Sequence, residues 1–244
     1  MNDMIKTLMN HRSIRKFNKK PVPDEIKEAI IKCAQMAPTS SHFQAYTIIN
    51  VIDSRKKAVM AASSGGQTWV ENAPIVLLFC ADLHRNQKYF NVEDTDVFNN
   101  VEAYTVAVVD TAFAAQKALI AAQGYGLGGV VVGGVRNDMY LMKKEFALPS
   151  MVVPLFLLCL GYPDEEPLQK PRFPYDLVVK RDVYSEQDED VLIEQYNQQV
   201  SGYLEKHTNG AEKYTWTESC SYSISLKPRY EVGDYVRAAG FLQK

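Results

Sequence analysis

The segment 11–17, with the sequence HRSIRKF, holds the residues best suited to chemistry near the N-terminus. Arginine, lysine, histidine and serine side chains bind phosphate groups through charge-assisted hydrogen bonds. Its apolar members, Ile14 and Phe17, are expected to pack inward and hold the segment in place. A second basic pair, Lys170 and Arg172, lies among prolines that exclude a helix or strand. Taken alone, either cluster could be a solvated surface, but we interpret segment 11–17 as one wall of a site for an anionic ligand.

Hydroxyl and glycine residues form three further candidate contacts with a ligand. The loop 38–44 is rich in hydroxyl groups, and it is either a polar connection or a ligand-facing loop. Gly65-Gly66-Gln67 interrupts a helical pattern. Gly133-Gly134 ends an apolar strand, where glycine lets a flat ligand approach the backbone and exposes amide donors. Without a ligand the same pair is a tight turn, and the residues alone leave both alternatives open.

Residues 124–129, with the sequence GYGLGG, match the G-x-G-x-x-G pattern of dinucleotide-binding folds. That fingerprint needs a strand before the glycines and a helix after them, because the phosphate must meet a helix N-terminus. Here a long helical pattern precedes the glycines and a strand pattern follows them. We therefore reject the dinucleotide-binding interpretation.

Composition and charge exclude several classes of function. The chain has 244 residues and a formal net charge of −2, so no global basic field attracts nucleic acid or a membrane. The cysteines Cys33, Cys80, Cys159 and Cys220 lack C-x-x-C spacing, so we expect no metal site and a reducing cytosolic compartment. Segment 1–10 has no apolar core of a signal peptide, and no apolar run is expected to span a bilayer.

Hydrophobic periodicity predicts the helices and strands of the chain. Helices are expected over 4–9, 23–37, 54–63, 101–123, 137–147, 185–207 and from 228 to the end. Strands are expected over 46–52, 75–81, 127–132 and 152–160, and an irregular exposed loop over 84–100. Helix 101–123 is apolar nearly all round, so it is buried in a domain centre or a subunit interface. No repeat and no linker between independent domains is evident.

The motifs follow one order along the chain: 11–15, 38–41, 65–67, 126–134, 157–163 and 170–172. This order and spacing resemble the FMN-dependent nitroreductase family, and more closely its oxygen-insensitive NADPH nitroreductase and NADPH–flavin oxidoreductase branch. The resemblance runs from His11 to about Tyr184. It implies an α+β fold with a central, mainly antiparallel sheet flanked by helices, in a single domain over 1–244. It also implies an intertwined homodimer with FMN at the interface, helix 101–123 at its centre, and embracing helices from about 185 to 244.

The resemblance also assigns contacts with FMN. His11, Arg12 and Ser13 hold one side of the phosphate, and Lys170 and Arg172 hold the other. Arg15 stabilises the reduced flavin at its pyrimidine edge. The remaining implied contacts are Thr39, Ser40 and Ser41 from the other subunit, and Gln67, Val131, Val132, Gly133 and Gly134. His42 and Phe43 line the substrate side or simply pack.

The implied reaction is hydride transfer from NAD(P)H, via bound FMN, to nitroaromatics, quinones or free flavins in a ping-pong cycle. No acid–base pair or nucleophile stands out, which agrees with a reaction carried by the cofactor. One alternative is a flavin-binding protein of the same fold that supplies flavin or balances thiol redox state. Another is an interaction module that binds no flavin.

One loop departs from the branch, in which arginines before the C-terminal tryptophan bind the 2′-phosphate of NADPH. Here the loop 207–216 offers Lys213 and His207 as cations, while Glu212 repels a phosphate. The choice between NADPH and NADH as electron donor therefore stays open.

Overall fold

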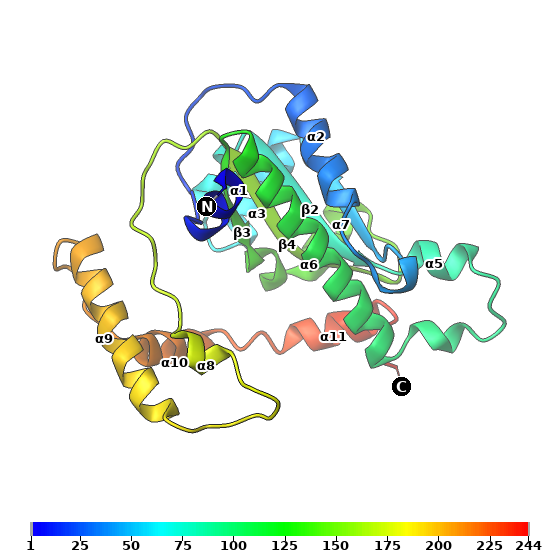
Figure 1. Ribbon diagram of the computed structural model, residues 1–244. Helices are drawn as coiled ribbons and strands as arrows, with labels where there is room; N and C mark the ends of the chain where they lie inside the picture. The colour runs from blue at the N-terminus through cyan, green and yellow to red at the C-terminus, as the bar shows by residue number, and fades with distance from the viewer. Residues whose placement is uncertain (1, 244) are drawn as a thin grey trace. The chain divides into compact units, whose positions relative to one another are not determined.

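The computed structural model describes residues 2–243, and an antiparallel sheet of four strands forms the framework on which the helices of residues 3–146 pack (Figure 1). The strands are β1 (Tyr46–Asn50), β2 (Ile75–Asp82), β3 (Gly128–Val132) and β4 (Val152–Gly161), in the spatial order β1-β2-β4-β3. β2 and β4 occupy the centre, and nearly all their residues are buried. The predicted α+β fold with an antiparallel sheet is confirmed, and all four predicted strands are present.

A proline interrupts the pairing of the two central strands. Pro154 of β4 lies opposite Cys80 of β2, and the register shifts between Phe79 and Cys80. Proline has no backbone N–H to donate, so it is tolerated inside a sheet at such an irregularity.

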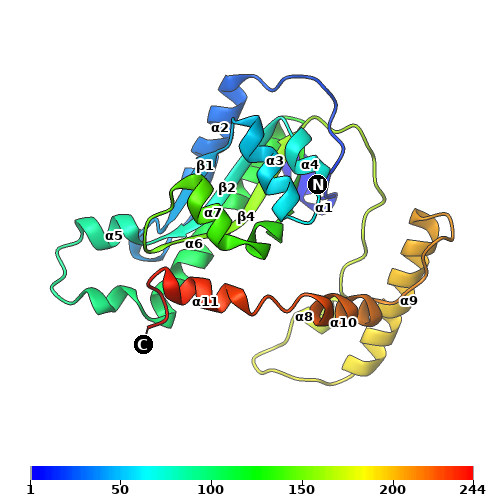
Figure 2. The same ribbon diagram turned by 180° about the vertical axis from the view of Figure 1, so that it is seen from behind.

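Helices cover both faces of the sheet and supply most of the remaining structure. The α-helices are α1 (Asp3–Met9), α2 (Asp24–Gln35), α3 (Ser54–Ser63), α4 (Thr68–Asn72), α5 (His84–Tyr89), α6 (Val101–Gly124), α7 (Met139–Phe146), α8 (Tyr175–Val178), α9 (Glu189–His207), α10 (Trp216–Leu226) and α11 (Glu231–Ala238). The short 3-10 helices are η1 (Ser40–His42), η2 (Thr95–Phe98) and η3 (Gly133–Asn137). α2 and α6 pack on the face that carries Leu77 and Leu158. Figure 2 shows α3, α4 and α7 on the opposite face, where they cover Leu78 and Leu157.

The chain divides into two compact units. Unit 1 comprises the chain up to Glu166 and the chain from Arg229 onward, and unit 2 comprises Pro167–Pro228. Within unit 2, the ring of Phe173 lies 4.6 Å from the Tyr196 ring and 4.9 Å from the Trp216 ring. These aromatic contacts hold the proline-rich segment 167–174 against α9 and α10.

The helix α6 has one buried side and one exposed side. By length and composition alone it could cross a membrane, contrary to the expectation that no apolar run is long enough. Its alanines at 114, 118 and 122 are fully buried against the sheet and α2, which is the packing of a core helix. Its other side exposes apolar side chains, among them Val101, Val109 and Phe113.

The segment 84–100 differs from the predicted irregular loop, because it contains α5 and η2. Although the sequence of this segment is polar, tertiary contacts hold it in an ordered conformation. The ring of Phe90 lies between two others: its centroid is 5.7 Å from that of Phe43 and 6.3 Å from that of Phe98. The buried Asn86 donates a side-chain hydrogen bond to the carbonyl oxygen of Phe43, at 2.9 Å.

Three C-terminal predictions need correction. α9 begins at Glu189 rather than near Ser185, whose hydroxyl accepts from the Gln187 amide in the preceding loop. α10 was not predicted, although Thr215 and Glu218 form a capping box at its start. The last helix, α11, occupies only Glu231–Ala238 of the predicted stretch from 228 to the end.

Candidate functional site

The segment 11–17 runs beside the edge strand β3, where glycines allow its close approach. Ser13 forms a parallel bridge with Gly129, and the Ile14 amide donates to the Gly129 carbonyl oxygen at 3.0 Å. A Cβ atom at Gly128 would lie 2.8 Å from the Cβ of buried Ile14, closer than real side chains pack. Gly128 therefore makes room for this segment. The G-x-G-x-x-G pattern runs from the last residue of α6 into β3, so a helix precedes the glycines and a strand follows, as predicted.

Arg12 has hydrogen-bonding capacity that the protein does not fully use. Its Nη1 atom lies 3.2 Å from Oε1 of Glu166, a carboxylate that is itself exposed. Its Nε atom is buried and has no hydrogen-bond partner among residues 2–243. A buried, unpaired guanidinium N–H is costly, and an anionic ligand would satisfy it. Nearby, the side chains of His11 and Gln123 lie 3.2 Å apart, Nδ1 to Nε2.

A glutamate fixes the backbone on the far side of the segment. Oε1 of Glu165 accepts from the amides of Arg15, at 2.5 Å, and Lys16, at 2.9 Å. Phe17 forms a bridge with Pro163 and packs against the core, so both apolar residues of the segment point inward as predicted.

Arg15 connects the segment to α4. Its guanidinium carbon lies 5.7 Å from the centroid of the Trp69 ring, within range of a cation–π interaction. Gln67 is the N-cap residue of the same helix, and its side chain makes no capping hydrogen bond. Gly65 and Gly66, with φ of 84° and 73°, form the turn that delivers Gln67.

The end of β3 touches the same turn. A Cβ at Gly134 would lie 2.6 Å from the Cβ of Ser64, so only glycine permits this contact. Gly133 lies against the guanidinium of Arg136, whose pKa is lowered by burial and by the nearby Arg229. Of the two preceding residues, Val132 is buried and Val131 is exposed. The structure thus brings segments 11–15, 64–69 and 128–134 together along one side of β3.

The hydroxyl-rich loop 38–44, called the serine loop below, packs against a different part of α6 from segment 11–15. The buried Asp110 accepts hydrogen bonds from the amides of Ser40, at 3.0 Å, and Ala45, at 3.1 Å. Asp110 precedes Gln123, the neighbour of His11, by 13 residues, which is about 20 Å along an α-helix. Within one chain, Thr39, Ser40 and Ser41 are therefore separated from segment 11–15. Asp110 was not singled out as a site residue, although it is a rare acid in an apolar helix.

The two proposed substrate residues of the loop have local partners. Nε2 of His42 lies 3.3 Å from Nε2 of Gln44. The ring of Phe43 packs at a tilt against Phe90. Phe43 is still partly exposed, so packing and substrate contact are both compatible with its position.

Four of the predicted residues belong to unit 2. Nη1 of Arg172 donates to the carbonyl oxygen of Lys170 at 3.1 Å. Lys170 also lines a hollow of about 210 Å³ with aromatic walls. In the loop 207–216, the His207 ring stacks on the Tyr203 ring with centroids 5.4 Å apart, and Nζ of Lys213 lies 3.6 Å from Oε2 of Glu205.

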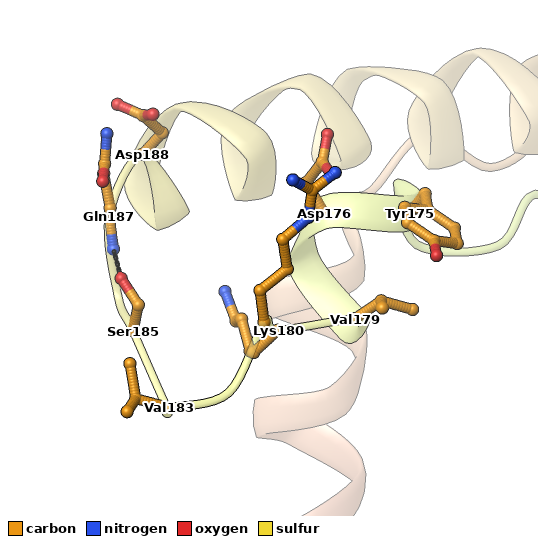
Figure 3. A pocket seen from close by; sticks show the side chains of 9 residues that line it. Tyr175, Asp176, Val179, Lys180, Val183, Ser185, Gln187 and Asp188 are labelled. Carbon is orange, nitrogen blue, oxygen red and sulfur yellow. Dashed lines mark hydrogen bonds between the residues drawn. The ribbon is translucent and has the colours of Figure 1, made fainter.

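Another hollow of unit 2 contains none of the predicted site residues. It lies between α8 and the start of α9 (Figure 3), and the side chains around it belong to Tyr175, Asp176, Val179, Lys180, Arg181, Val183, Ser185, Gln187 and Asp188. Two residues of this loop, Asp182 and Asp188, adopt positive φ.

Residues 2–243 contain neither a candidate metal site nor a disulfide bond. That part of the chain contains no cluster of three potential metal ligands, and all four cysteines are free. Burial raises the pKa of the Cys159 thiol to about 12 and also raises the pKa of Cys80, so both thiols stay protonated at neutral pH.

Comparison with known proteins decides the family. The model described as "Nitroreductase family" matches residues 8–162, and the model of its C-terminal domain matches residues 170–244. The chain belongs to the nitroreductase family. The resemblance inferred from the order of the motifs is therefore confirmed.

Similar proteins cover the whole chain. An "FMN reductase (NADPH)" of Bacillus subtilis is 36% identical over 246 residues, covering 99% of each chain. The solved NfrA1 nitroreductase from B. subtilis is 35% identical, with a TM-score of 0.96 over 99% of this chain and 100% of the other. The NADPH:FMN oxidoreductase from Vibrio harveyi, complexed with NAD+, is 33% identical, with a TM-score of 0.90 over 100% of both chains.

The glycine contact at β3 predicts a stability effect. Replacing Gly128 by alanine forces Ile14 to move, so we expect the free energy of unfolding to fall by about 1–3 kcal/mol. Urea unfolding at fixed protein concentration measures this change. The matched control is Gly124→Ala, because nothing lies within 4 Å of a Cβ at that glycine. Equal stability of the two variants would contradict the assigned role of Gly128.

Proposed function

We propose that this protein is an FMN-dependent oxidoreductase that transfers a hydride from NADPH or NADH to nitroaromatics, quinones or free flavins. The names of its relatives support both the cofactor and the reaction class. The observation that carries the proposal is the buried, unpaired Nε of Arg12 beside three converging segments. Such a guanidinium fits the phosphate of FMN, which carries about two negative charges near neutral pH.

Each part of the β3 site has a proposed task. His11, Arg12 and Ser13 bind the phosphate, and Arg15, oriented by Trp69, places a fixed cation at the pyrimidine edge. The side-chain amide of Gln67 has both donor and acceptor atoms for that edge, and no capping hydrogen bond of α4 occupies it. Val131, Val132, Gly133 and Gly134 would line the bound flavin. FMN would supply the hydride chemistry, and these residues would bind and orient it and set its electrostatic surroundings.

We further propose that the active form is a homodimer. One side of α6 exposes Val101, Val109 and Phe113, an apolar face suited to a second copy of the chain. Thr39, Ser40 and Ser41 are separated from segment 11–15 of their own chain along α6. In the proposed dimer a second copy brings its own loop 38–44 to that segment, so each site draws residues from both chains.

Unit 2 has a proposed role in the same dimer. Lys170 follows Glu166, the partner of Arg12, by four residues, so the chain between them spans at most about 14 Å. Lys170 and Arg172 are therefore proposed as the second side of the phosphate site. The helices from about 185 onward are proposed to embrace the partner, and the whole chain to act as one domain.

The electron donor and the acceptor are proposed to bind in turn beside the flavin, near His42 and Phe43 of the loop 38–44 that the second copy brings to the site. His207 and Lys213 are the proposed contacts with the donor. Lys213 already faces Glu205, and Glu212 accepts from Tyr214, so this loop favours a second phosphate only weakly. Free cysteines agree with a proposed cytosolic location.

FMN uptake and reduction test the proposal directly. The purified protein should be yellow or become so with added FMN, and stopped-flow mixing with NADPH or NADH should bleach the flavin. We expect the two donors to differ by less than about tenfold in rate, because Lys213 and Glu212 largely offset each other. A protein that takes up no FMN overturns the proposal. A strong preference for NADPH overturns only the interpretation of the 207–216 loop.

The ion pair of Arg12 gives a second prediction. Arg12→Gln removes a charged phosphate contact, so we expect the Kd for FMN to rise by about 10- to 100-fold. Glu166→Gln removes the competing carboxylate, so it should leave FMN binding unchanged or slightly tighter. Quenching of flavin fluorescence measures both values. Equal weakening by the two changes would show that the ion pair, rather than Arg12 itself, matters.

Arg15 gives a third prediction, which concerns rate rather than affinity. Arg15→Ala should retain much of the FMN but slow its reduction by about tenfold or more, because it removes a fixed cation from the flavin edge. Arg15→Lys keeps the charge and serves as the control. Unchanged stopped-flow reduction of the alanine variant would refute the electrostatic role.

A further inference from the structure

Asp110 is a buried carboxylate that the proposed reaction does not yet use. It lies midway along α6 and is 1% exposed. Among residues 2–243 no cation forms an ion pair with it, although an isolated buried charge is unfavourable. Its oxygens instead accept two backbone hydrogen bonds, Oδ1 from Ser40 and Oδ2 from Ala45. One carboxylate therefore holds both ends of the loop 40–45.

The loop needs such an external constraint. Ser41, His42 and Gln44 have φ of 45°, 59° and 51°, a left-handed conformation that residues other than glycine seldom adopt. Ser40, Ser41 and His42 are exposed, so apolar packing contributes little to their order. The side chain of Asn86 holds the middle of the loop at Phe43.

The loop also borders the exposed face of α6. A hollow of about 370 Å³ lies between them, lined by Pro38, Thr39, Ser40 and, from α6, by Thr105, Val106, Val109, Asp110 and Phe113. The hydrogen bonds of Asp110 thus set where the hydroxyl groups stand on the surface that a second copy is proposed to meet.

We propose that Asp110 is a positioning residue for the cofactor site of the partner chain. By holding the amides of Ser40 and Ala45, it fixes Thr39, Ser40 and Ser41 in the one arrangement that meets FMN in the dimer. It acts through the loop and does not itself touch the cofactor. This inference rests on the proposed FMN-dependent function.

The adjacent residue supplies a matched control. Thr111 is fully buried, and its hydroxyl donates to the carbonyl oxygens of Cys80, at 3.3 Å, and Ala107, at 2.6 Å, without touching the loop. Asp110→Asn turns one of the two acceptors into a donor that faces an amide N–H. Thr111→Val removes buried hydrogen bonds from the same helix turn and leaves the loop anchored.

The test combines hydrogen–deuterium exchange of the apoprotein with FMN titration of the dimer. In Asp110→Asn, peptides covering 38–46 should exchange faster, and the Kd for FMN should rise by about tenfold. Thr111→Val should lower the unfolding midpoint but change neither quantity. Size-exclusion chromatography with light scattering should find a dimer in both variants.

A second pair of variants tests the same bonds from the loop side, in case Asp110→Asn fails to fold. Ser40→Pro removes the amide hydrogen that Asp110 accepts, at a position that begins η1 and tolerates proline. Thr39 precedes it with an extended ψ of 149°, which a following proline permits. Ser40→Ala keeps the amide and removes only the hydroxyl. Ser40→Pro should weaken FMN binding about tenfold more than Ser40→Ala does.

The outcomes separate this inference from the proposed function. If the wild-type protein takes up no FMN, the proposed function fails. Suppose the wild-type protein binds FMN, but Asp110→Asn and Thr111→Val show the same hydrogen–deuterium exchange over 38–46 and the same Kd for FMN. The positioning role of Asp110 is then refuted. The role is also refuted if Ser40→Pro and Ser40→Ala bind FMN equally, or if only Asp110→Asn becomes monomeric.

Discussion

The candidate site depends on a contact between two backbones that only glycine permits. Segment 11–17 lies against β3 because Gly128 presents no side chain toward Ile14, and the backbone of Gly129 pairs with Ser13 and Ile14. At the other end of the same strand, Gly134 admits Ser64 in the same way. Two segments distant in sequence are thereby held on either end of one short strand. The basic residues gain fixed positions from this packing, which a flexible N-terminal segment could not give them.

The sequence carried most of the fold because hydrophobic patterning dominates it. β2 and β4 are nearly continuous apolar runs with helices on both faces, and α6 is largely apolar, with Glu102, Asp110 and Lys117 as its charged residues. The site was partly predictable for a different reason: segments 11–15, 65–67 and 133–134 stand out by residue type. Their proximity follows from close contacts at Gly128 and Gly134. The contact at Gly128 was not predicted, because the G-x-G-x-x-G pattern was only tested, and rejected, as a dinucleotide-binding motif.

The features that the sequence did not predict are those that depend on contacts between residues far apart in the chain. α5 is ordered through Asn86 and Phe90, whose contact residue is Phe43. Glu165 and Glu166 belong to no motif in the sequence, yet Glu165 accepts from the Arg15 amide and Glu166 pairs with the Arg12 side chain. No periodicity encodes such long-range polar contacts, because each depends on a tertiary fold that already exists. A rare acid in an apolar helix, as at Asp110, was the one local signal of this kind.

The length of α6 has a genetic consequence in the proposed dimer. The helix holds the serine loop near Asp110 and meets His11 near Gln123, so one chain contributes to two different sites. Consider a mixed dimer of one chain with a substituted serine loop and one chain with a substituted Arg12. Both substitutions would then fall in the same site, because each site takes its loop from one chain and its Arg12 from the other. The other site would be assembled from intact parts alone. Two inactive alleles of such a protein can therefore complement each other, and a strain carrying both would recover up to half of the sites in its mixed dimers.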